Sequence, residues 1–505
     1  MSVLNTVISW FMKKRMHQIE LFLKYPIEVQ EEVRRKLVDS AKSTEWGKQY
    51  GYADLRTAHD FRQRIPVSSY EQLQPYIDRI MRGEQQVLWP SEIKWFAKSS
   101  GTTNDRSKFI PVSEEALEDC HYKAGKDLLS MYCHLNPDTR LFAGKGLTIG
   151  GSHQISQLNN DSYYGDLSAV LMQNLPFWAE FIRTPELSVA LLEKWEEKVV
   201  RIGTETMKQD VTSISGVPTW IIVLFRWMLE HSGKQHMHEI WPNLEVYFHG
   251  GVSFNPYRAQ FKELIPGRHM HYMETYNASE GFFGMADRFD TDEMLLMLDY
   301  GIYYEFVDPA EAQHPNARTF TLEEVEVDKV YAVIISTNAG LWRYLIGDTI
   351  RFTSLNPFRF RISGRTKQYI NAFGEELMVE NAEQGLKAAC EATGAQIRDY
   401  TAGPVFLTTA SKGRHQWLIE FEHAPTNQAM FNDILDRRLR EVNSDYDAKR
   451  QNDLALLTPD ILVVADGTFY GWMKKRGKLG GQNKVPRLAN DRKFLDDILL
   501  YLGEA

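Results

Sequence analysis

The segment IKWFAKSSGTTNDRSKFIPV, residues 93–112, places a polar run between two apolar runs. The apolar runs predict two strands, and SSGTTNDRSK at 99–108 predicts a turn of small and hydroxylated residues between them. Such a turn presents backbone N–H groups and hydroxyls to one point, and Lys108 adds a positive charge. The segment is therefore either a polyphosphate site or an ordinary surface turn, and taken alone it leaves both open.

Composition limits the classes of protein to which the chain can belong. Its 505 residues suggest two to four domains, and 43% hydrophobic with 25% charged residues indicate a folded protein rather than a disordered one. The formal net charge of -9 provides no general basic surface, so we expect neither nucleic acid nor an anionic membrane as a partner. No run of about 18 apolar residues occurs, so no membrane span is predicted. No GxxxxGK[ST] string occurs either, which argues against a P-loop NTPase.

The cysteines favour a reducing compartment. Cys120, Cys133 and Cys390 are odd in number and have no CxxC or Cys/His spacing, so neither a disulfide framework nor a structural zinc site is predicted. A cytoplasmic location fits this usage. The N-terminal MSVLNTVISWFMKKRM has its basic residues after its apolar stretch, which predicts an amphipathic helix rather than a signal peptide.

Hydrophobic periodicity divides the chain into two parts. Residues 1–50 have helical periodicity and are expected to form a helical scaffold. From about 90 to 350, β-rich and helical runs alternate, which predicts α/β layers with loops at strand ends available for chemistry. After 351 the pattern becomes that of a smaller α+β unit, with a helix expected near 379–393, a hairpin-like pair PVFLTTA and HQWLIEFEH, and a charged helix expected near 426–450. We expect a large N-terminal domain over 1–362 and a small C-terminal domain over 363–505.

Two later segments place carboxylates at strand ends. In HYMETYNASEG, Glu280 follows a strand, where it could hold a Mg²⁺ ion that bridges phosphate oxygens. The alternative is a helix N-terminus capped by Ser279, with Glu280 in its first turn. In WRYLIGD, Asp348 ends an apolar strand and could accept from both ribose hydroxyls of a nucleotide, or it could belong to an ordinary Gly-Asp turn.

Two basic segments lie at the expected boundary and near the C-terminus. SGRTKQYINAFGEEL, residues 363–377, carries Arg365 and Lys367, and GKLGGQNKVPRL, residues 477–488, carries Lys484 in a glycine-rich loop.

Together these segments resemble the GH3 family of acyl acid amido synthetases, within the adenylate-forming superfamily. SSGTTNDRSK has the longer spacing of the GH3 pattern SSGT[ST]xGxxK, YNASEG resembles the GH3 Tyr-x-x-x-Glu motif, and WRYLIGD and QNKVPR resemble two further family strings. The resemblance spans about residues 90 to 490. It implies an α/β fold of adenylate-forming architecture: a large N-terminal domain of α/β layers with a β-barrel-like part, and a small mobile α+β C-terminal domain.

The resemblance also implies a reaction. ATP activates a carboxylic acid as acyl-AMP, and an amino acid then takes the acyl group to give an amide, with ATP and Mg²⁺ as cofactors. Lys484 is implied to be the catalytic lysine, Glu280 the metal ligand, Asp348 and Arg365 the ribose contacts, and Lys367 the hinge.

The remaining implied site residues fall into three groups. The phosphate group comprises Ser99, Ser100, Gly101, Thr102, Thr103 and Lys108, and the adenine and α-phosphate group comprises Thr275, Tyr276, Asn277, Ala278 and Ser279. The acyl-pocket candidates, which could equally be core residues, are Val217, His249, Gly250, Gly251 and Phe282.

Two departures from the pattern keep alternatives open. Asp105 replaces the glycine expected in the phosphate loop, which brings a carboxylate near the phosphates and admits a nucleotide-binding regulator without turnover. The junction has Lys367, Gln368 and Asn371 where many CoA ligases have GRxDDxIK. An acyl-CoA or other thioester-forming ligase remains the second enzymatic alternative. The acid, the amino acid and the oligomeric state are not identified by the sequence.

Overall fold

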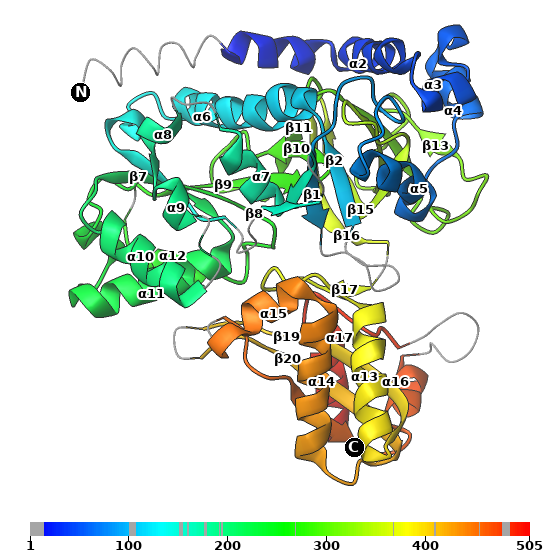
Figure 1. Ribbon diagram of the computed structural model, residues 1–505. Helices are drawn as coiled ribbons and strands as arrows, with labels where there is room; N and C mark the ends of the chain where they lie inside the picture. The colour runs from blue at the N-terminus through cyan, green and yellow to red at the C-terminus, as the bar shows by residue number, and fades with distance from the viewer. Residues whose placement is uncertain are drawn as a thin grey trace.

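A twelve-stranded sheet forms the centre of the larger of two lobes (Figure 1). The computed structural model describes residues 15–99, 108–150, 155–158, 161–175, 179–190, 192, 195–267, 269–366, 368–408, 411–453, 455–476 and 485–504. The strand order is β13-β12-β14-β15-β16-β11-β10-β9-β8-β7-β3-β6. From β9 to β6 neighbouring strands are parallel, and from β9 to β13 they are antiparallel. The fold is therefore mixed α/β, as predicted.

The strands of this sheet are β3 (Lys145–Thr148), β6 (Arg183–Thr184), β7 (Val211–Gly216), β8 (Val246–Gly250), β9 (His271–Ala278), β10 (Gly281–Met285), β11 (Met294–Leu296), β12 (Ile302–Val307), β13 (Thr319–Phe320), β14 (Val330–Thr337), β15 (Tyr344–Leu355) and β16 (Phe358–Arg365).

A second, four-stranded sheet holds the two strands predicted around SSGTTNDRSK. Its order is β2-β1-β5-β4, with bounds β1 (Trp95–Ser99), β2 (Lys108–Val112), β4 (Ser156–Gln157) and β5 (Tyr163–Gly165). β1 and β2 are antiparallel and pair Ser99 with Lys108, so the two ends of the predicted phosphate segment lie opposite each other.

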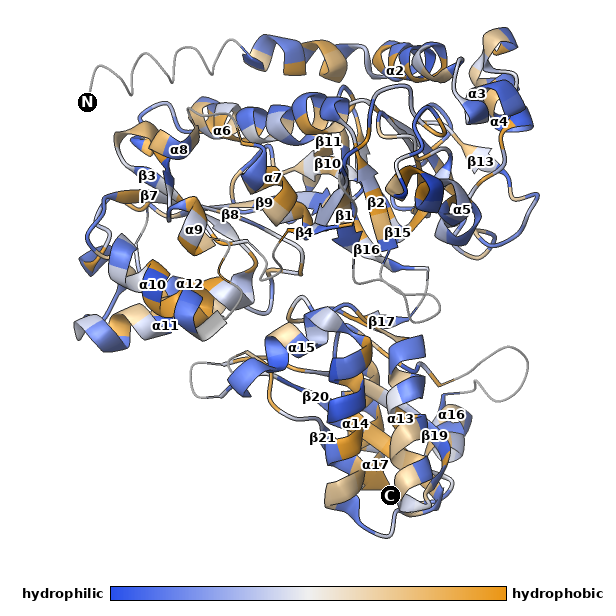
Figure 2. Cartoon of the chain, in the orientation of Figure 1, coloured by the Kyte–Doolittle hydropathy of each residue, from blue (hydrophilic) through white to orange (hydrophobic). Residues whose placement is uncertain are grey.

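Helices surround the sheets of the large lobe. They are α2 (Pro26–Ala41), α3 (Glu45–Gln49), α4 (Ala58–Arg64), α5 (Tyr70–Met81), a π-helix (Ala116–Tyr122) continuing into α6 (Lys123–Leu135), α7 (Leu167–Gln173), α8 (Ala179–Ile182), α9 (Leu187–Ala190), α10 (Trp195–Thr206), α11 (Pro218–Ser232) and α12 (Arg258–Leu264). Hydrophilic and hydrophobic residues mix along α2 and α6 in Figure 2, as expected for helices that bury one face.

The predicted N-terminal scaffold is helical where the structure describes it, from residue 15 onward. Gln30 of α2 donates from Nε2 to the carbonyl oxygens of Leu298 (2.8 Å) and Ile302 (2.9 Å). Arg15 pairs with the buried carboxylate of Asp127, at 2.6 Å from its Oδ1. These contacts fix the helices against the strands that carry the central core.

The small lobe is α+β, with a three-stranded sheet of order β19-β20-β21. Its elements are β17 (Tyr369–Ile370), β18 (Leu377–Met378), α13 (Val379–Thr393), β19 (Gln396–Val405), β20 (Arg414–His423), α14 (Gln428–Val442), α15 (Ser444–Arg450), β21 (Asp460–Val464), α16 (Thr468–Lys475) and α17 (Lys493–Glu504).

The expected boundary between residues 362 and 363 falls inside β16, which remains in the large sheet to Arg365. The first strand of the C-terminal part begins at Tyr369. The helix expected near 379–393 has those bounds. The charged helix expected near 426–450 is divided at Asn443, whose side chain accepts from the Tyr446 N–H and caps α15.

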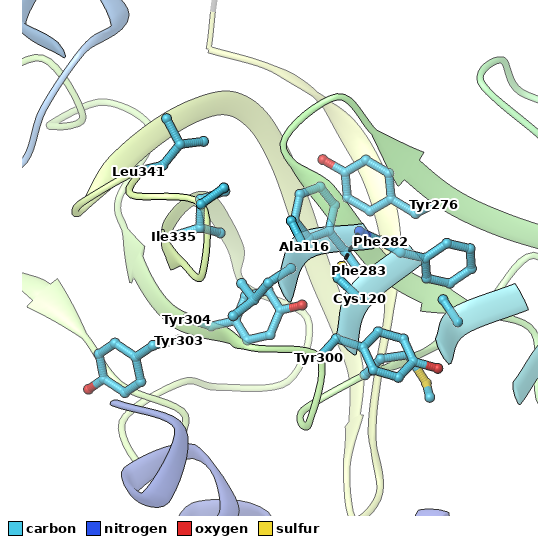
Figure 3. Packing of buried hydrophobic residues seen from close by; sticks show 14 of the residues in the cluster. Ala116, Cys120, Tyr276, Phe282, Phe283, Tyr300, Tyr303, Tyr304, Ile335 and Leu341 are labelled. Atoms are coloured by element: carbon cyan, nitrogen blue, oxygen red, sulfur yellow. Dashed lines mark hydrogen bonds between the residues drawn. The ribbon is translucent and has the colours of Figure 1, made fainter. Parts of the chain in front are cut away.

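The centre of the large lobe is aromatic (Figure 3). Phe282 and Phe283 of β10 pack with Tyr276, Tyr300 and Tyr304 at ring-centroid distances of 4.8 to 6.3 Å. These aromatic contacts hold β9 and β10 rigidly, and the turn between those two strands carries Glu280.

Candidate active site

A cavity of about 760 Å³ lies where the two lobes meet. The large lobe contributes β9, the β9–β10 turn, β15 and β16, and the small lobe contributes the segment around β17 and the start of α15. Described lining residues include Ser99, Lys108, Ser168, Gly251, Glu274, Thr275, Tyr276, Asn277, Ala278, Ser279, Glu280, Asp348, Arg365, Tyr369, Asn371, Glu376 and Asp445.

Asp348 and Arg365 form the central ion pair of this cavity. They face each other in register on β15 and β16, with Arg365 Nε 2.6 Å from Asp348 Oδ1. The Tyr276 hydroxyl donates to the other oxygen of the same carboxylate. Burial and then the Asp348 charge raise the pKa of Tyr276 well above its usual range, so this hydroxyl stays protonated and donates. The carboxylate is thus held by one group on the neighbouring strand β16 and by a second group on β9, farther along the same sheet.

Arg365 is fixed from the small-lobe side as well. Its Nη2 lies 3.3 Å from Glu376 Oε1, and its guanidinium carbon lies 4.8 Å from the centre of the Tyr369 ring. The side chain is 20% exposed. A planar guanidinium held in this way offers its remaining N–H groups in one fixed direction.

Glu280 lies in the tight turn that joins β9 to β10, so the alternative of a helix capped by Ser279 is wrong. The Tyr344 hydroxyl donates to Glu280 Oε1 at 3.5 Å, and Lys108 Nζ donates to the Tyr344 oxygen at 3.5 Å. Burial raises the pKa of Glu280, and the Lys108 charge opposes this rise. A cation bound beside the carboxylate would favour its ionised form in the same way.

The predicted phosphate segment is described only at its ends. Ser99 and Lys108 both line the cavity. Lys108 Nζ also lies 5.6 Å from the centre of the Tyr70 ring. Five residues predicted or discussed for this segment lie outside the described residues: Ser100, Gly101, Thr102, Thr103 and Asp105. The same holds for Lys367 and Lys484, the implied hinge and catalytic lysine.

The segment 275–279, implied to contact adenine and the α-phosphate, lines the cavity throughout. Thr275 Oγ1 donates to the His249 carbonyl oxygen at 3.1 Å, which fixes β9 against β8. Tyr276 supplies the hydroxyl bound to Asp348.

Sequence reasoning missed Glu274, which lines the cavity two residues before Tyr276 on β9. Burial raises its pKa to about 7. Because residues i and i+2 of a strand share a face, the strand pattern could have indicated that Glu274 lies on the face of Tyr276. Tyr344, Tyr369 and Glu376 lie inside strings quoted above but were given no role, because only folding brings them to Glu280 and Arg365.

The structure places the acyl-pocket candidates in two different environments. Gly251 lines the cavity, whereas Val217, His249, Gly250 and Phe282 are not among its described lining residues. His249 is 2% exposed and stacks on Phe254 at 4.1 Å between ring centroids, and burial lowers its pKa to about 3. It occupies the position of a structural histidine.

Two other candidates have packing roles. A Cβ on Gly250 would lie 2.4 Å from the Thr275 carbonyl oxygen, so this glycine permits the close approach of β8 and β9. Phe282 is buried in the aromatic core, and its backbone N–H donates to Cys120 Sγ at 3.2 Å (Figure 3). Core packing, the alternative interpretation from the sequence, accounts for both positions.

Within the described residues, no group of three or more His, Cys, Asp and Glu side chains is arranged to hold a metal ion. A search of the described helices finds none with the length and apolar character of a membrane span.

Family models match three segments that together cover most of the chain. The GH3 family N-terminal domain matches residues 15–270, the GH3 family central domain residues 295–365, and the GH3 family C-terminal domain residues 380–493.

Among known proteins, the chain is similar to an indole-3-acetic acid-amido synthetase, GH3.3, of Arabidopsis thaliana. The two are 24% identical over 91% of this chain and 89% of that protein. It is also similar to a jasmonoyl–L-amino acid synthetase, GH3.5, of Oryza sativa subsp. japonica, at 22% identity over 95% of each.

Solved structures share the fold. The GH3.15 acyl acid amido synthetase superposes with a TM-score of 0.61 at 17% identity, over 96% of this chain and 95% of that one. A 2-hydroxyisobutyryl-CoA ligase in complex with 2-HIB-AMP and CoA superposes with a TM-score of 0.54 at 14% identity, over 99% of this chain and 92% of that one.

Proposed function

The chain belongs to the GH3 family, and we propose that it activates a carboxylic acid with ATP as acyl-AMP and then transfers the acyl group to the amine of an amino acid. The residue roles proposed below depend on one observation: residues from distant parts of the chain meet in one cavity. Lys108, Glu280, Asp348 and Arg365 come from four separate parts of the sequence and line one cavity between the lobes.

In the proposed first step, the acid's carboxylate attacks the α-phosphate of ATP and pyrophosphate leaves. Two anions must approach each other, so the site has to offset their repulsion. Asp348 accepts from the ribose hydroxyls and Arg365 fixes Asp348, while Ser99 and Lys108 hold the polyphosphate. Glu280 would hold Mg²⁺, and a bound Mg²⁺ would supply charge neutralisation at the phosphate oxygens.

Lys484 is the proposed catalytic lysine, and it would bind the oxygens that gain negative charge during adenylation. Removing one comparable oriented donor costs about 2.7 to 4 kcal/mol in other enzymes. The lysine belongs to the C-terminal part and Lys108 to the N-terminal part, so the site is completed only when the lobes come together. Lys367, just after β16, is the proposed hinge.

In the proposed second step, the neutral amine of an amino acid attacks the acyl carbonyl and AMP leaves. The amine must lose a proton before or during attack. We propose that the acceptor enters between the lobes, where residues of both lobes line the cavity. The cytoplasmic location expected from the cysteines stays a prediction.

The test is a competition between acceptors. The protein, ATP and Mg²⁺ are incubated with a library of carboxylic acids and either the amino acids or CoA, and products are identified by mass spectrometry. We expect AMP and an amide. AMP formation that requires CoA and never an amino acid would establish the thioester-forming alternative instead.

A second test separates an enzyme from a nucleotide-binding regulator. Acid-dependent exchange of pyrophosphate into ATP should fall about 100-fold or more in Lys484→Ala. It should stay near the wild-type rate in Lys478→Ala, which removes a lysine from the same glycine-rich loop. Absence of exchange in the wild-type protein with every acid tested would favour the regulator.

A further inference from the structure

A second cavity, of about 660 Å³, shares no lining residue with the candidate active site. It is framed by α4 and the segment after it, and by the chain around β13, and both elements lie at the end of the large lobe beyond α5 (Figure 1). Its described lining residues are His59, Arg62, Gln63, Arg64, Ile65, Pro66, Val67, Pro315, Asn316, Ala317, Arg318, Thr319, Glu324 and Arg343.

This cavity is strongly positive. Four arginines line it, Arg62, Arg64, Arg318 and Arg343, and Glu324 is the one carboxylate among the described lining residues. Glu305 lies behind the wall and neutralises Arg343 through a buried pair at 2.8 Å. Two positive charges therefore remain without a matching carboxylate.

The floor of the cavity is rigid. The Arg343 guanidinium is 4% exposed and donates to both Glu305 oxygens, at 2.8 and 2.9 Å, and to the Arg62 carbonyl oxygen at 2.9 Å. Arg62 in turn donates from Nη1 to the Thr319 carbonyl oxygen at 3.0 Å and to Glu324 at 2.7 Å. The conformational entropy of these two side chains is already lost in the folded protein, so a ligand would not have to order them.

Arg64 and Arg318, at the rim of the cavity, have N–H groups in addition to those bonded within the protein. Arg64 uses Nη1 for the Gly51 carbonyl oxygen, and Arg318 uses Nη2 for Glu324 at 3.2 Å. The guanidinium carbon of Arg318 lies 4.8 Å from the centre of the Phe320 ring, which directs its plane. Each guanidinium carries five N–H groups, so most of these donors face solvent or the cavity.

We propose that this cavity binds a small polyanion with two or more negative charges on phosphate or carboxylate groups. The planar forks of Arg64 and Arg318 match such groups in a bidentate manner, and the surplus of two positive charges sets the minimum charge of the ligand. The hollow is large enough for a metabolite rather than a single ion.

The cavity is also connected to the candidate active site. The segment that forms its wall continues into Ser68, whose N–H donates to the Arg343 carbonyl oxygen at 2.9 Å. Tyr70 follows, and its hydroxyl accepts from the Phe109 N–H at 2.8 Å, while its ring lies 5.6 Å from Lys108 Nζ. A polyanion that tightens this segment would hold Lys108 more firmly, so we expect a lower KM for ATP; this effect rests on the proposed function, whereas the binding itself does not.

The binding test uses citrate on the full-length protein, without nucleotide or metal. Isothermal titration is compared in buffers matched to the same ionic strength with sodium chloride, because weak electrostatic binding is screened by salt. Wild type should bind citrate, and the double variant Arg64→Gln/Arg318→Gln should weaken binding at least tenfold. The control Arg351→Gln removes an exposed arginine of β15 that does not line the cavity and should bind as wild type.

Either of two results would overturn the proposal that this cavity binds a polyanion. One is no citrate binding above the chloride background, and the other is equal binding by the double variant, which would locate the anion elsewhere, such as in the nucleotide cavity. Thermal melting of both variants near the wild-type temperature verifies that they are folded.

The coupling is tested with citrate at constant free Mg²⁺. Citrate should lower the KM for ATP at least twofold in wild type and in Arg351→Gln, but not in the double variant. If citrate binds but leaves the KM for ATP unchanged, the coupling to the candidate active site is rejected, while the proposed polyanion site still stands. A protein that binds citrate but never forms AMP would instead refute the proposed function.

Discussion

Asp348 and Arg365 are 17 residues apart in sequence and directly opposite each other on β15 and β16, with 2.6 Å between their charged groups. The pair lies at the last residue of β16, immediately before the chain leaves the large lobe. The proposed ribose contact and the start of the connection between lobes are therefore adjacent in the structure.

Asp348→Asn should raise the KM for ATP about 10- to 100-fold, because a charged hydrogen-bond acceptor is worth about 1.5–3 kcal/mol. Steady-state kinetics with ATP as the varied substrate measures this. The matched control is Asp287→Asn, which breaks a similar pair between Asp287 and Arg359, 2.6 Å apart, on the same sheet. If both variants change KM equally, the effect is one of sheet stability rather than ribose binding.

Glu280→Gln should abolish most Mg²⁺-dependent AMP formation, with a melting temperature close to wild type. Burial raises the pKa of Glu280, so the folded state favours the protonated carboxyl group and disfavours the carboxylate. The stability that the protonated group contributes is lost as pH rises through the folded-state pKa. The neutral amide should therefore be at least as stable as wild type at pH 8. A fall of more than about 5 °C would indicate a structural role for the carboxylate in the turn.

Lys449→Met should raise the unfolding free energy at pH 7 by up to about 3 kcal/mol, because burial lowers the pKa of Lys449 from 10.5 to about 8 and a tenfold change in proton affinity corresponds to about 1.4 kcal/mol. Lys449 of α15 lies over the Trp220 ring of α11, 3.9 Å from its centre, across the contact between lobes. Burial lowers its pKa to about 8; Asp445, Glu375 and Asp166 oppose this shift.

The pH dependence of this effect has a defined sign. Below about pH 8, Lys449 is protonated in both the folded and the unfolded chain. The folded state then bears the full free-energy cost of burying the charged ammonium group. Between about pH 8 and the usual lysine pKa, the unfolded chain binds more protons, and wild-type stability rises toward that of the variant. Urea titrations at pH 7 and pH 9.5 test this, with Lys387→Met, a lysine side chain 75% exposed, as the control. A difference that does not shrink with pH would contradict the assignment.

Thiol reagents should modify one cysteine ahead of the other two in the native protein, even though partial burial also raises the pKa of that residue, Cys390. Cys120 and Cys133 are buried, and burial raises the pKa of Cys120 to about 12, whereas Cys390 on α13 is partly accessible. The thiolate is the reactive form, so Cys120 should react only after unfolding. Counting modified thiols with and without denaturant measures this, and Cys390→Ser should remove the fast phase. Fast modification of Cys120 would mean that the aromatic core opens in the native state.

Local sequence predicted the elements well where periodicity was strong. The strands on both sides of SSGTTNDRSK and the helix at 379–393 were expected and observed. The strand expected to end at Asp348 is also present, but β15 continues past Asp348 to Leu355, so Asp348 lies within a strand and not in a Gly-Asp turn. The apolar patterns of these elements are set by local geometry, which needs no knowledge of partners. The pair PVFLTTA and HQWLIEFEH was only half right, because the first strand, β19, spans Gln396–Val405 and includes only Pro404 and Val405 of PVFLTTA. The part of β19 before Pro404 is stabilised by cross-strand pairing with β20, a non-local contact.

The candidate site followed from the sequence only where motifs exist. Glu280, Asp348 and Arg365 were expected from their strings, and all line one cavity. His249, Gly250 and Phe282 were placed among the acyl-pocket candidates by string similarity, yet each is explained by contacts inside the large lobe. Aromatic and glycine residues serve packing and binding equally well, so residue type cannot separate the two roles.

The sequence by itself determined the family, the order of the motifs and the chemistry of their side chains, because these depend on residue type and spacing along the chain. The tertiary structure alone decided which residues meet: it placed Tyr276 on Asp348, Glu376 on Arg365 and Tyr344 beside Glu280, and it gathered four arginines around a second cavity. The physical reason is that these contacts join segments distant in sequence, and their positions are fixed by strand register and core packing rather than by local preference.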